Sequence, residues 1–191
     1  PTTIDTENLH NPDLYRVTKK NPGKITIGWT GSHSTLKYLN EIEDVLCKIL
    51  HTHPEVEFVV IADQPPTFRD IQAIFIPWNP ETEIEDLLKF DIGIMPLPDD
   101  DWAKGKCGFK ALQYMALERP SVASPVGVNS KIISNGENGF LCVTAERWEE
   151  VLLILIQNTQ LRKQLGINAR RKIRENYSVT SNASNFLSLF E

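Results

Sequence analysis

The stretch KITIGW (Lys24–Trp29), followed directly by TGSHS (Thr30–Ser34), decides the fold class. Its first part is short, apolar and β-branched, which is typical of a buried strand. Its second part combines glycine with hydroxyl residues, as in a tight turn between a strand and a helix. Leucine and isoleucine then recur at helical spacing through Thr35–His51. We therefore expect a strand, a glycine turn and a helix, with Ser34 as the helix N-cap.

The same alternation continues to the end of the chain. Further strands are predicted at Val56–Ala62, Ile74–Trp78, Asp91–Met95, Ser121–Ser124 and Gly139–Val143. Further helices are predicted at Pro80–Phe90, Phe109–Leu117, Asn129–Ser134, Ala145–Gln157, Gln160–Asn176 and Thr180–Phe190. This order predicts an α/β fold with a doubly wound, parallel, six-stranded Rossmann-like sheet and C-terminal helices. Ligands of such sheets bind at the carboxyl ends of the strands, so the loops at 30–34, 63–66, 78–80, 96–108 and 125–129 are the candidate binding loops.

The composition excludes several classes of protein. The chain has 191 residues, of which 41% are apolar and 24% charged, as in an ordinary globular domain. The formal net charge of −5 and the lack of a basic cluster argue against a nucleic-acid partner. The apolar run Val151–Ile156 is too short to cross a membrane, and we find no signal peptide. The 3 cysteines lie far apart without metal-ligand spacing, which favours a reducing, cytoplasmic location.

The loop after the first strand is the first candidate for ligand binding. Gly31 would let a ligand approach the backbone, and the N–H groups of the following helix start attract phosphate. Ser32, Ser34 and Thr35 add hydroxyl donors. His33 is either a further donor to a ligand oxygen or simply an exposed loop histidine. A tight turn capped by serine is the alternative interpretation of the same residues.

The second candidate is WAKGKCGFKALQYMA (Trp102–Ala116), which follows the strand ending at Met95. Glycines and lysines lead into a helix whose Lys110 and Gln113 lie three apart and so share one face. Amide and ammonium groups together neutralise a diphosphate well. The alternative is a solvated basic loop before a core helix. The nearby run Asp99–Asp101 is interpreted as acidic side chains on a solvent-exposed loop rather than as a metal site.

The sequence GKCGFKALQYMALERPSVASPVGVNSKIISNGENGFL (Gly105–Leu141) resembles the donor-domain signature of retaining GT-B glycosyltransferases, family 4 or "group 1". The start of the chain, Pro1–Asp5, resembles the end of the interdomain strand of that family. The resemblance implies the C-terminal, nucleotide-sugar-binding domain of a hexosyltransferase-like enzyme. We accordingly divide the chain into an interdomain arm (1–22), the nucleotide-sugar-binding domain (23–178) and a C-terminal helix (179–191).

The resemblance also implies roles for individual residues. The loop after the first strand would approach the diphosphate, and Trp78 would lie near the base. The helix start at Gly108–Lys110 would meet the phosphates, and Gln113 would meet the ribose. Lys106 and Lys110 are the candidate stabilisers of the leaving diphosphate, in place of a metal ion. We expect no metal and no cofactor beyond the nucleoside-diphosphate sugar substrate. The full set of expected donor-binding residues is Gly31, Ser32, His33, Trp78, Lys106, Gly108, Phe109, Lys110 and Gln113.

The partners implied by the resemblance lie outside this chain. A missing N-terminal domain would bind a glycan or lipid-linked acceptor in polysaccharide biosynthesis, so the isolated domain is expected to be inactive. The C-terminal helix would pack on that domain. Without it, four apolar residues would favour self-association: Phe186, Leu187, Leu189 and Phe190. Any attachment to the inner membrane would be made through the missing part.

Two positions depart from the family pattern. Gly105 stands where many members have a carboxylate that faces the sugar, and Gln113 where they have one that faces the ribose. The alternative is therefore a catalytically degenerate Rossmann-like module that binds a phosphate-bearing metabolite or serves assembly.

Overall fold

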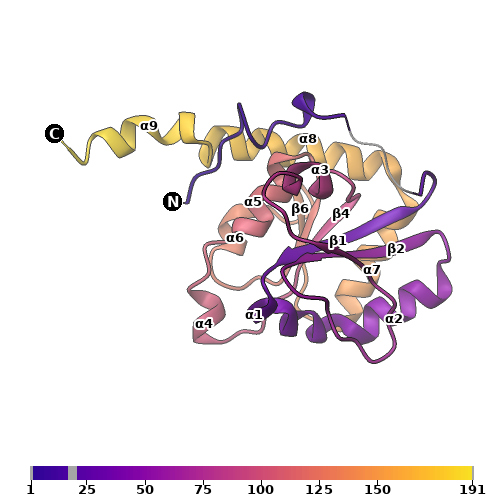
Figure 1. Cartoon of the computed structure of the whole chain (residues 1–191). Helices are drawn as coiled ribbons and strands as arrows, with labels where there is room; N and C mark the ends of the chain where they lie inside the picture. The colour runs from indigo at the N-terminus through magenta and orange to yellow at the C-terminus, as the bar shows by residue number, and fades with distance from the viewer. Residues whose placement is uncertain (1, 17–20, 191) are drawn as a thin grey trace.

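The computed structural model describes residues 2–16 and 21–190, so Pro1, residues 17–20 and Glu191 lie outside the described part of the predicted arm and C-terminal helix. The strands are β1 (Ile25–Gly31), β2 (Val56–Ala62), β3 (Ile74–Pro77), β4 (Ile92–Met95), β5 (Ser121–Ala123) and β6 (Gly139–Leu141). They form one sheet in the order β3-β2-β1-β4-β5-β6, and the paired strands are all parallel (Figure 1). The predicted six-stranded, doubly wound sheet is thereby confirmed.

Helices cover both faces of this sheet. They are η1 (Pro12–Leu14), α1 (His33–Leu36), η2 (Lys37–Ile42), α2 (Glu43–Thr52), α3 (Glu83–Leu87), α4 (Asp101–Lys104), α5 (Phe109–Ala116), α6 (Asn129–Ile132), α7 (Ala145–Gln157), α8 (Thr159–Asn176) and α9 (Val179–Leu187). Figure 1 shows α2 and α7 below the sheet and α3, α5 and α8 above it. None of the helices within the described ranges is both long and apolar enough to span a membrane.

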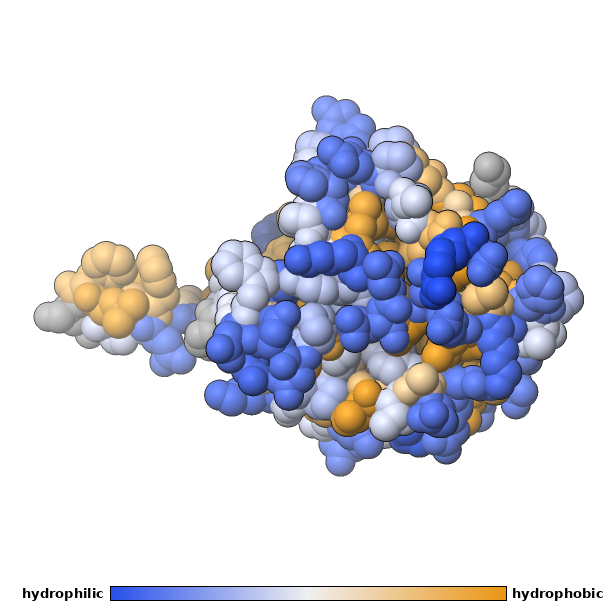
Figure 2. Space-filling view, turned by 90° about the horizontal axis from the view of Figure 1, so that it is seen from below, coloured by the Kyte–Doolittle hydropathy of each residue, from blue (hydrophilic) through white to orange (hydrophobic). Residues whose placement is uncertain are grey.

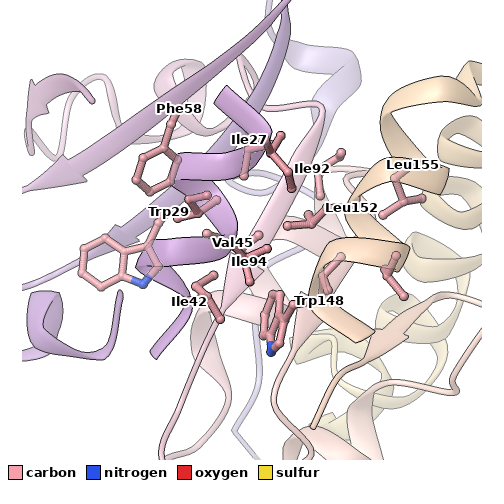
Figure 3. Packing of buried hydrophobic residues seen from close by; sticks show 14 of the residues in the cluster. Ile27, Trp29, Ile42, Val45, Phe58, Ile92, Ile94, Trp148, Leu152 and Leu155 are labelled. Atoms are coloured by element: carbon pink, nitrogen blue, oxygen red, sulfur yellow. The ribbon is translucent and has the colours of Figure 1, made fainter. Parts of the chain in front are cut away.

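The larger core lies between the sheet and the α2–α7 layer. Trp29 and Phe58 on the strands face Val45 of α2 and Trp148 of α7 across this layer (Figure 3). Trp148 is only 3% exposed, so it serves the core of this domain. The sheet is buried on both faces, which explains why its strands are near-continuous apolar runs.

Several predicted helices differ from the observed ones at their ends, and α4 lies in a segment predicted as a loop; two of the differences concern the loops around the sheet's carboxyl edge. The helix expected at Thr35–His51 consists of α1, the tighter 3-10 segment η2 and α2, and it begins at His33 after Ser32 rather than after Ser34. The Asp63 carboxylate accepts the His33 N–H at 2.5 Å and so satisfies the helix start from another loop. The helix expected at Pro80–Phe90 is confined to Glu83–Leu87, because a turn closed by Thr82 N–H and Asn79 C=O at 3.2 Å precedes it.

The N-terminal arm packs along the C-terminal helices. The Ile4 N–H donates to Tyr177 C=O at 2.9 Å, and the Val179 N–H donates to Ile4 C=O at 3.0 Å. Arg170 of α8 donates to the Asn11 side chain at 2.7 Å. The described part of the arm therefore follows α8 up to the point where α9 begins.

Candidate functional site

A pocket of about 640 Å³ opens at the carboxyl ends of the central strands. Its walls come from the loops after β1, β2, β3 and β4, from the first residue of α3 and from one side of α5. The strand order reverses between β1 and β4, and this switch point is where open α/β sheets form their ligand crevice. The topology thus places the pocket where the sequence predicts a binding site.

Most of the predicted donor-binding residues lie around this one pocket. Those that line it are Gly31, Ser32, Trp78, Lys106, Gly108, Phe109, Lys110 and Gln113. His33 lies on a neighbouring hollow instead, where its Nδ1 is 2.5 Å from Asp63 Oδ2. The Asp63 carboxylate accepts from both the backbone and the ring of His33, and these bonds hold the pKa of Asp63 below its usual value. His33 therefore does not line the pocket itself, but it holds Asp63, which does.

Helix α5 starts at the pocket because of Gly108. This glycine has a φ of +72°, a left-handed conformation that side chains other than glycine rarely adopt. A Cβ there would come within 2.5 Å of the Ile132 Cδ1 atom. The backbone can consequently turn sharply against α6 and place the first turn of α5, whose N–H groups have no partner within the helix, at the pocket.

The second residue of α5, Lys110, reaches across the pocket floor to β1. Its Nζ lies 5.4 Å from the centre of the Trp29 ring, a cation–π distance. Gly31 leaves room for this approach, since a Cβ there would be 2.8 Å from Lys110 Cε. Burial, with a further contribution from Lys106, lowers the pKa of Lys110 to about 8. The ammonium is thus held in a poorly hydrated position that an anionic ligand would stabilise.

Lys106 supplies a second positive charge at the pocket. Its Nζ lies 5.2 Å from the Tyr38 ring and 5.9 Å from the Trp102 ring. Within residues 2–16 and 21–190, no carboxylate forms an ion pair with Lys106 or Lys110. Both ammonium groups are consequently available to a ligand.

Lys104 behaves differently from these two lysines. Its Nζ pairs with Asp99 at 3.2 Å and with Asp101 at 3.8 Å, and it is absent from the pocket lining. Asp100 caps α4 by accepting the Ala103 N–H at 2.6 Å. The acidic run therefore has structural partners. Among the described residues no group of three or more His, Cys, Asp or Glu side chains is arranged to hold a metal ion.

Helix α5 is fixed to the strands beneath it by Tyr114. The Tyr114 hydroxyl accepts the Thr30 N–H at 3.0 Å and donates to Ile94 C=O at 3.4 Å. The ring is fully buried, and burial raises the pKa of its hydroxyl well above the usual range. This side chain ties α5 to β1 and β4 on either side of the switch point.

The sequence alone did not single out Glu83. Its Oε1 accepts from Gln113 Nε2 at 3.1 Å and from the Trp78 indole Nε1 at 3.1 Å, and the residue lines the pocket. Gln113 itself is only 3% exposed. Glu83 sits in an acidic helix, where a solvated side chain is the usual expectation. The sequence feature that indicates a pocket position for Glu83 is its place just after the loop that contains Trp78.

Gly105 also lines the pocket and has ordinary backbone angles, with φ −75° and ψ −6°. The nearest atom to a Cβ at this position would be the Trp102 carbonyl oxygen at 3.4 Å, an ordinary contact distance. The chain could therefore accommodate a side chain here. The fold therefore does not require glycine at position 105, and the absence of a side chain there affects the pocket alone.

Solved structures share this fold. The C-terminal domain of the glycosyl transferase group 1 protein LpcC from Francisella tularensis is 23% identical, with a TM-score of 0.69 over 92% of this chain and 99% of that one. Anabaena HepE, solved with UDP and glucose, is 16% identical, with a TM-score of 0.74 over 99% of this chain and 55% of HepE. At such identities the likeness establishes the fold.

The sequence comparisons establish the family. The trehalose synthase of Thermococcus litoralis is 29% identical over 82 residues, which are 43% of this chain and 20% of that enzyme. The match thus spans a fifth of the curated relative. The sequence model of the glycosyl transferases group 1 family matches residues 24–158, which contain all six strands and the pocket. The chain belongs to the glycosyl transferases group 1 family.

Proposed function

We propose that this chain is the donor-binding domain of a retaining glycosyltransferase and that its pocket holds a nucleoside-diphosphate sugar. The observation that carries the proposal is the pair of ammonium groups, Lys106 and Lys110, that face the pocket without a carboxylate ion-pair partner in the described parts of the chain. They lie beside the start of α5, whose N–H groups add positive potential. A diphosphate is the ligand chemistry that two cations and a helix start favour together.

In the proposed reaction the bond between the anomeric carbon and the diphosphate oxygen breaks, and the diphosphate leaves with the electron pair. The acceptor hydroxyl oxygen bonds to the same carbon on the same face, and its proton is released to water. Lys106, Lys110 and the α5 start would stabilise the charge on the leaving diphosphate, and the proposal assigns no role to a metal ion. We propose a glycan or lipid-linked acceptor in cytoplasmic polysaccharide synthesis, bound by a domain that precedes this chain.

Isothermal titration of the chain with UDP, GDP and ADP tests donor binding. We expect at least one nucleotide to bind, and K106A and K110A each to weaken that binding about tenfold or more without a fall in the melting temperature. K104A is the matched control, because Lys104 is ion-paired and lies outside the pocket lining. The proposal fails if no nucleotide binds at millimolar concentration. It also fails if the two pocket variants lose stability but keep their affinity.

A second function is favoured by Gly105. If the missing carboxylate means that the site does not hold a sugar, the chain is a degenerate module that binds a phosphate-bearing metabolite or serves assembly. Titration with UDP-sugars separates the two proposals. A donor site binds one UDP-sugar more tightly than UDP, because the sugar adds contacts, whereas the degenerate module does not distinguish them.

The arm and α9 form the proposed attachment to the rest of a longer protein. We propose that the segments 1–22 and 179–191 join the sheet domain to an N-terminal acceptor domain and that α9 packs on it. Two observations support this: α9 extends away from the body of the domain in Figure 1, and its Phe186 and Leu187 are 62% and 60% exposed. A protein that includes the preceding sequence should protect α9 amides from hydrogen exchange, whereas this chain alone should not.

A further inference from the structure

Glu83 is a carboxylate at the pocket that forms no ion pair within the part of the chain that the structure describes. It is partly buried and lines the pocket. Across residues 2–16 and 21–190, no lysine, arginine or histidine forms an ion pair with it. Taking a carboxylate partly out of water costs free energy unless hydrogen-bond donors compensate for the lost solvent. Glu83 therefore needs donors, and its surroundings show which ones the protein supplies.

The protein directs two donors at one oxygen of this carboxylate. Oε1 accepts from Trp78 Nε1 and from Gln113 Nε2, each at 3.1 Å, and these donors come from the loop after β3 and from α5. An ionised carboxylate has about four acceptor positions on its two oxygens. The two fixed donors use half of them and lock the orientation of the group. The remaining acceptor positions, on Oε2 above all, have no hydrogen-bond donor within the described residues.

The carboxylate of Glu83 and the ammonium groups of Lys106 and Lys110 line the same pocket. Gln113, which holds Glu83, lies one helical turn along α5 from Lys110, so their Cβ atoms are about 5–6 Å apart. Phosphate oxygens would be attracted to Lys110 and repelled by Glu83. The part of a ligand that meets Glu83 must therefore be neutral, rich in hydrogen-bond donors and joined to the phosphates by a short link.

We propose that Glu83 accepts hydrogen bonds from the 2′ and 3′ hydroxyls of the nucleotide ribose, and that Trp78 and Gln113 position its carboxylate. The proposal rests on the proposed function, since it assumes a nucleoside diphosphate at Lys106 and Lys110. The ribose adjoins the diphosphate, and its vicinal diol offers two O–H donors to a carboxylate with vacant acceptor positions. The base lies one unit further on, beside the exposed part of the Trp78 ring. Glu83 is thereby a specificity-determining residue for ribonucleotides.

The inference is tested by titrating the wild-type chain and E83Q with UDP and 2′-deoxy-UDP. We expect the wild type to bind UDP about tenfold more tightly than 2′-deoxy-UDP, the loss typical of one hydrogen bond to a charged group. E83Q keeps an oxygen that can accept from Trp78 and Gln113, so the fold and the pocket shape should persist. Its preference for the 2′ hydroxyl should fall to about threefold or less. Inorganic pyrophosphate should bind E83Q at least as well as the wild type.

The matched control is E85Q, which makes the same charge change at an exposed position of α3. It should leave the preference for UDP over 2′-deoxy-UDP unchanged. If the wild type binds UDP but E83Q keeps the full preference, the role of Glu83 is overturned while the proposed function stands. If E83Q changes only the ratio between UDP and GDP, the carboxylate contacts the base and the ribose assignment is wrong. If no nucleotide binds the wild type, the proposed function fails and this inference fails with it.

Discussion

Lys110 sets the pH range in which the pocket can hold an anion. Its pKa of about 8 in the ligand-free protein means that the side chain is charged at pH 7 and loses its proton as the pH rises further. A diphosphate favours the charged form, so binding above pH 8 must take up a proton. We expect affinity for UDP to fall by up to about tenfold per pH unit above pH 8. Titration calorimetry from pH 6.5 to 9.5 measures this.

The control for this prediction is K110Q, whose affinity should be lower and nearly independent of pH over that range. Stability should change in the opposite direction. Because burial lowers the pKa of Lys110 from its ordinary value of 10.5, the unfolded chain binds more protons at this side chain between pH 8 and 10.5. The Lys110 contribution to the free energy of unfolding therefore rises with pH in that window. Affinity that rose together with stability would contradict the assignment of the site to Lys110.

The hydrogen bond between Gln113 and Glu83 requires an amide donor at one of the two positions and a carboxylate acceptor at the other. Replacing Gln113 by Glu places two carboxylates where an amide now donates to Glu83 at 3.1 Å. We expect Q113E to lower the free energy of unfolding at pH 7 by about 2 kcal/mol, because a bond is lost and like charges meet. The double variant E83Q/Q113E restores one amide and one carboxylate and should recover more than half of this loss. Urea unfolding of all four proteins gives the coupling.

At the scale of elements, the strands are more predictable than the helix ends. β2 and α7 have the predicted bounds, because apolar runs and helical periodicity are local signals. The start of α1 at His33 depends on the Asp63 carboxylate, which is 30 residues away in the sequence. Glu83 likewise enters the pocket through a bond to Gln113 over 30 residues. Features made by such long-range partners leave no periodic pattern in the sequence.

The start of α5 tests how much the pocket depends on one backbone conformation. We expect G108A to lower the free energy of unfolding by about 3 kcal/mol, because it combines a strained φ with the contact to Ile132. G136A is the matched control: Gly136 has a φ of +81° but no atom within 4 Å of a Cβ, so about 1 kcal/mol is expected. Equal losses in urea unfolding would show that packing against α6 is unimportant.

At the scale of the whole molecule, α9 stands apart from the sheet domain. Figure 2 shows it as an apolar projection. The Phe186 and Phe190 rings meet edge to face with their centroids 5.3 Å apart, and the two residues are 62% and 76% exposed. We expect the chain to self-associate through this helix at concentrations of about 100 µM. Sedimentation velocity should show F186D/F190D to be monomeric. I167D, at an exposed apolar position of α8, should leave the association unchanged.

The backbone bonds that join Ile4 to Tyr177 and Val179 bring the arm and α9 to one line on the surface. If the proposed acceptor domain is attached through both segments, this line is the axis about which it would turn relative to the sheet domain. Turning would bring the pocket mouth toward that domain or away from it, while Lys110 and Trp29 keep their relative positions inside the rigid sheet domain. Substrate entry would then depend on rotation about the axis formed by the arm and α9. Donor binding would depend on the pocket at the switch point of the sheet.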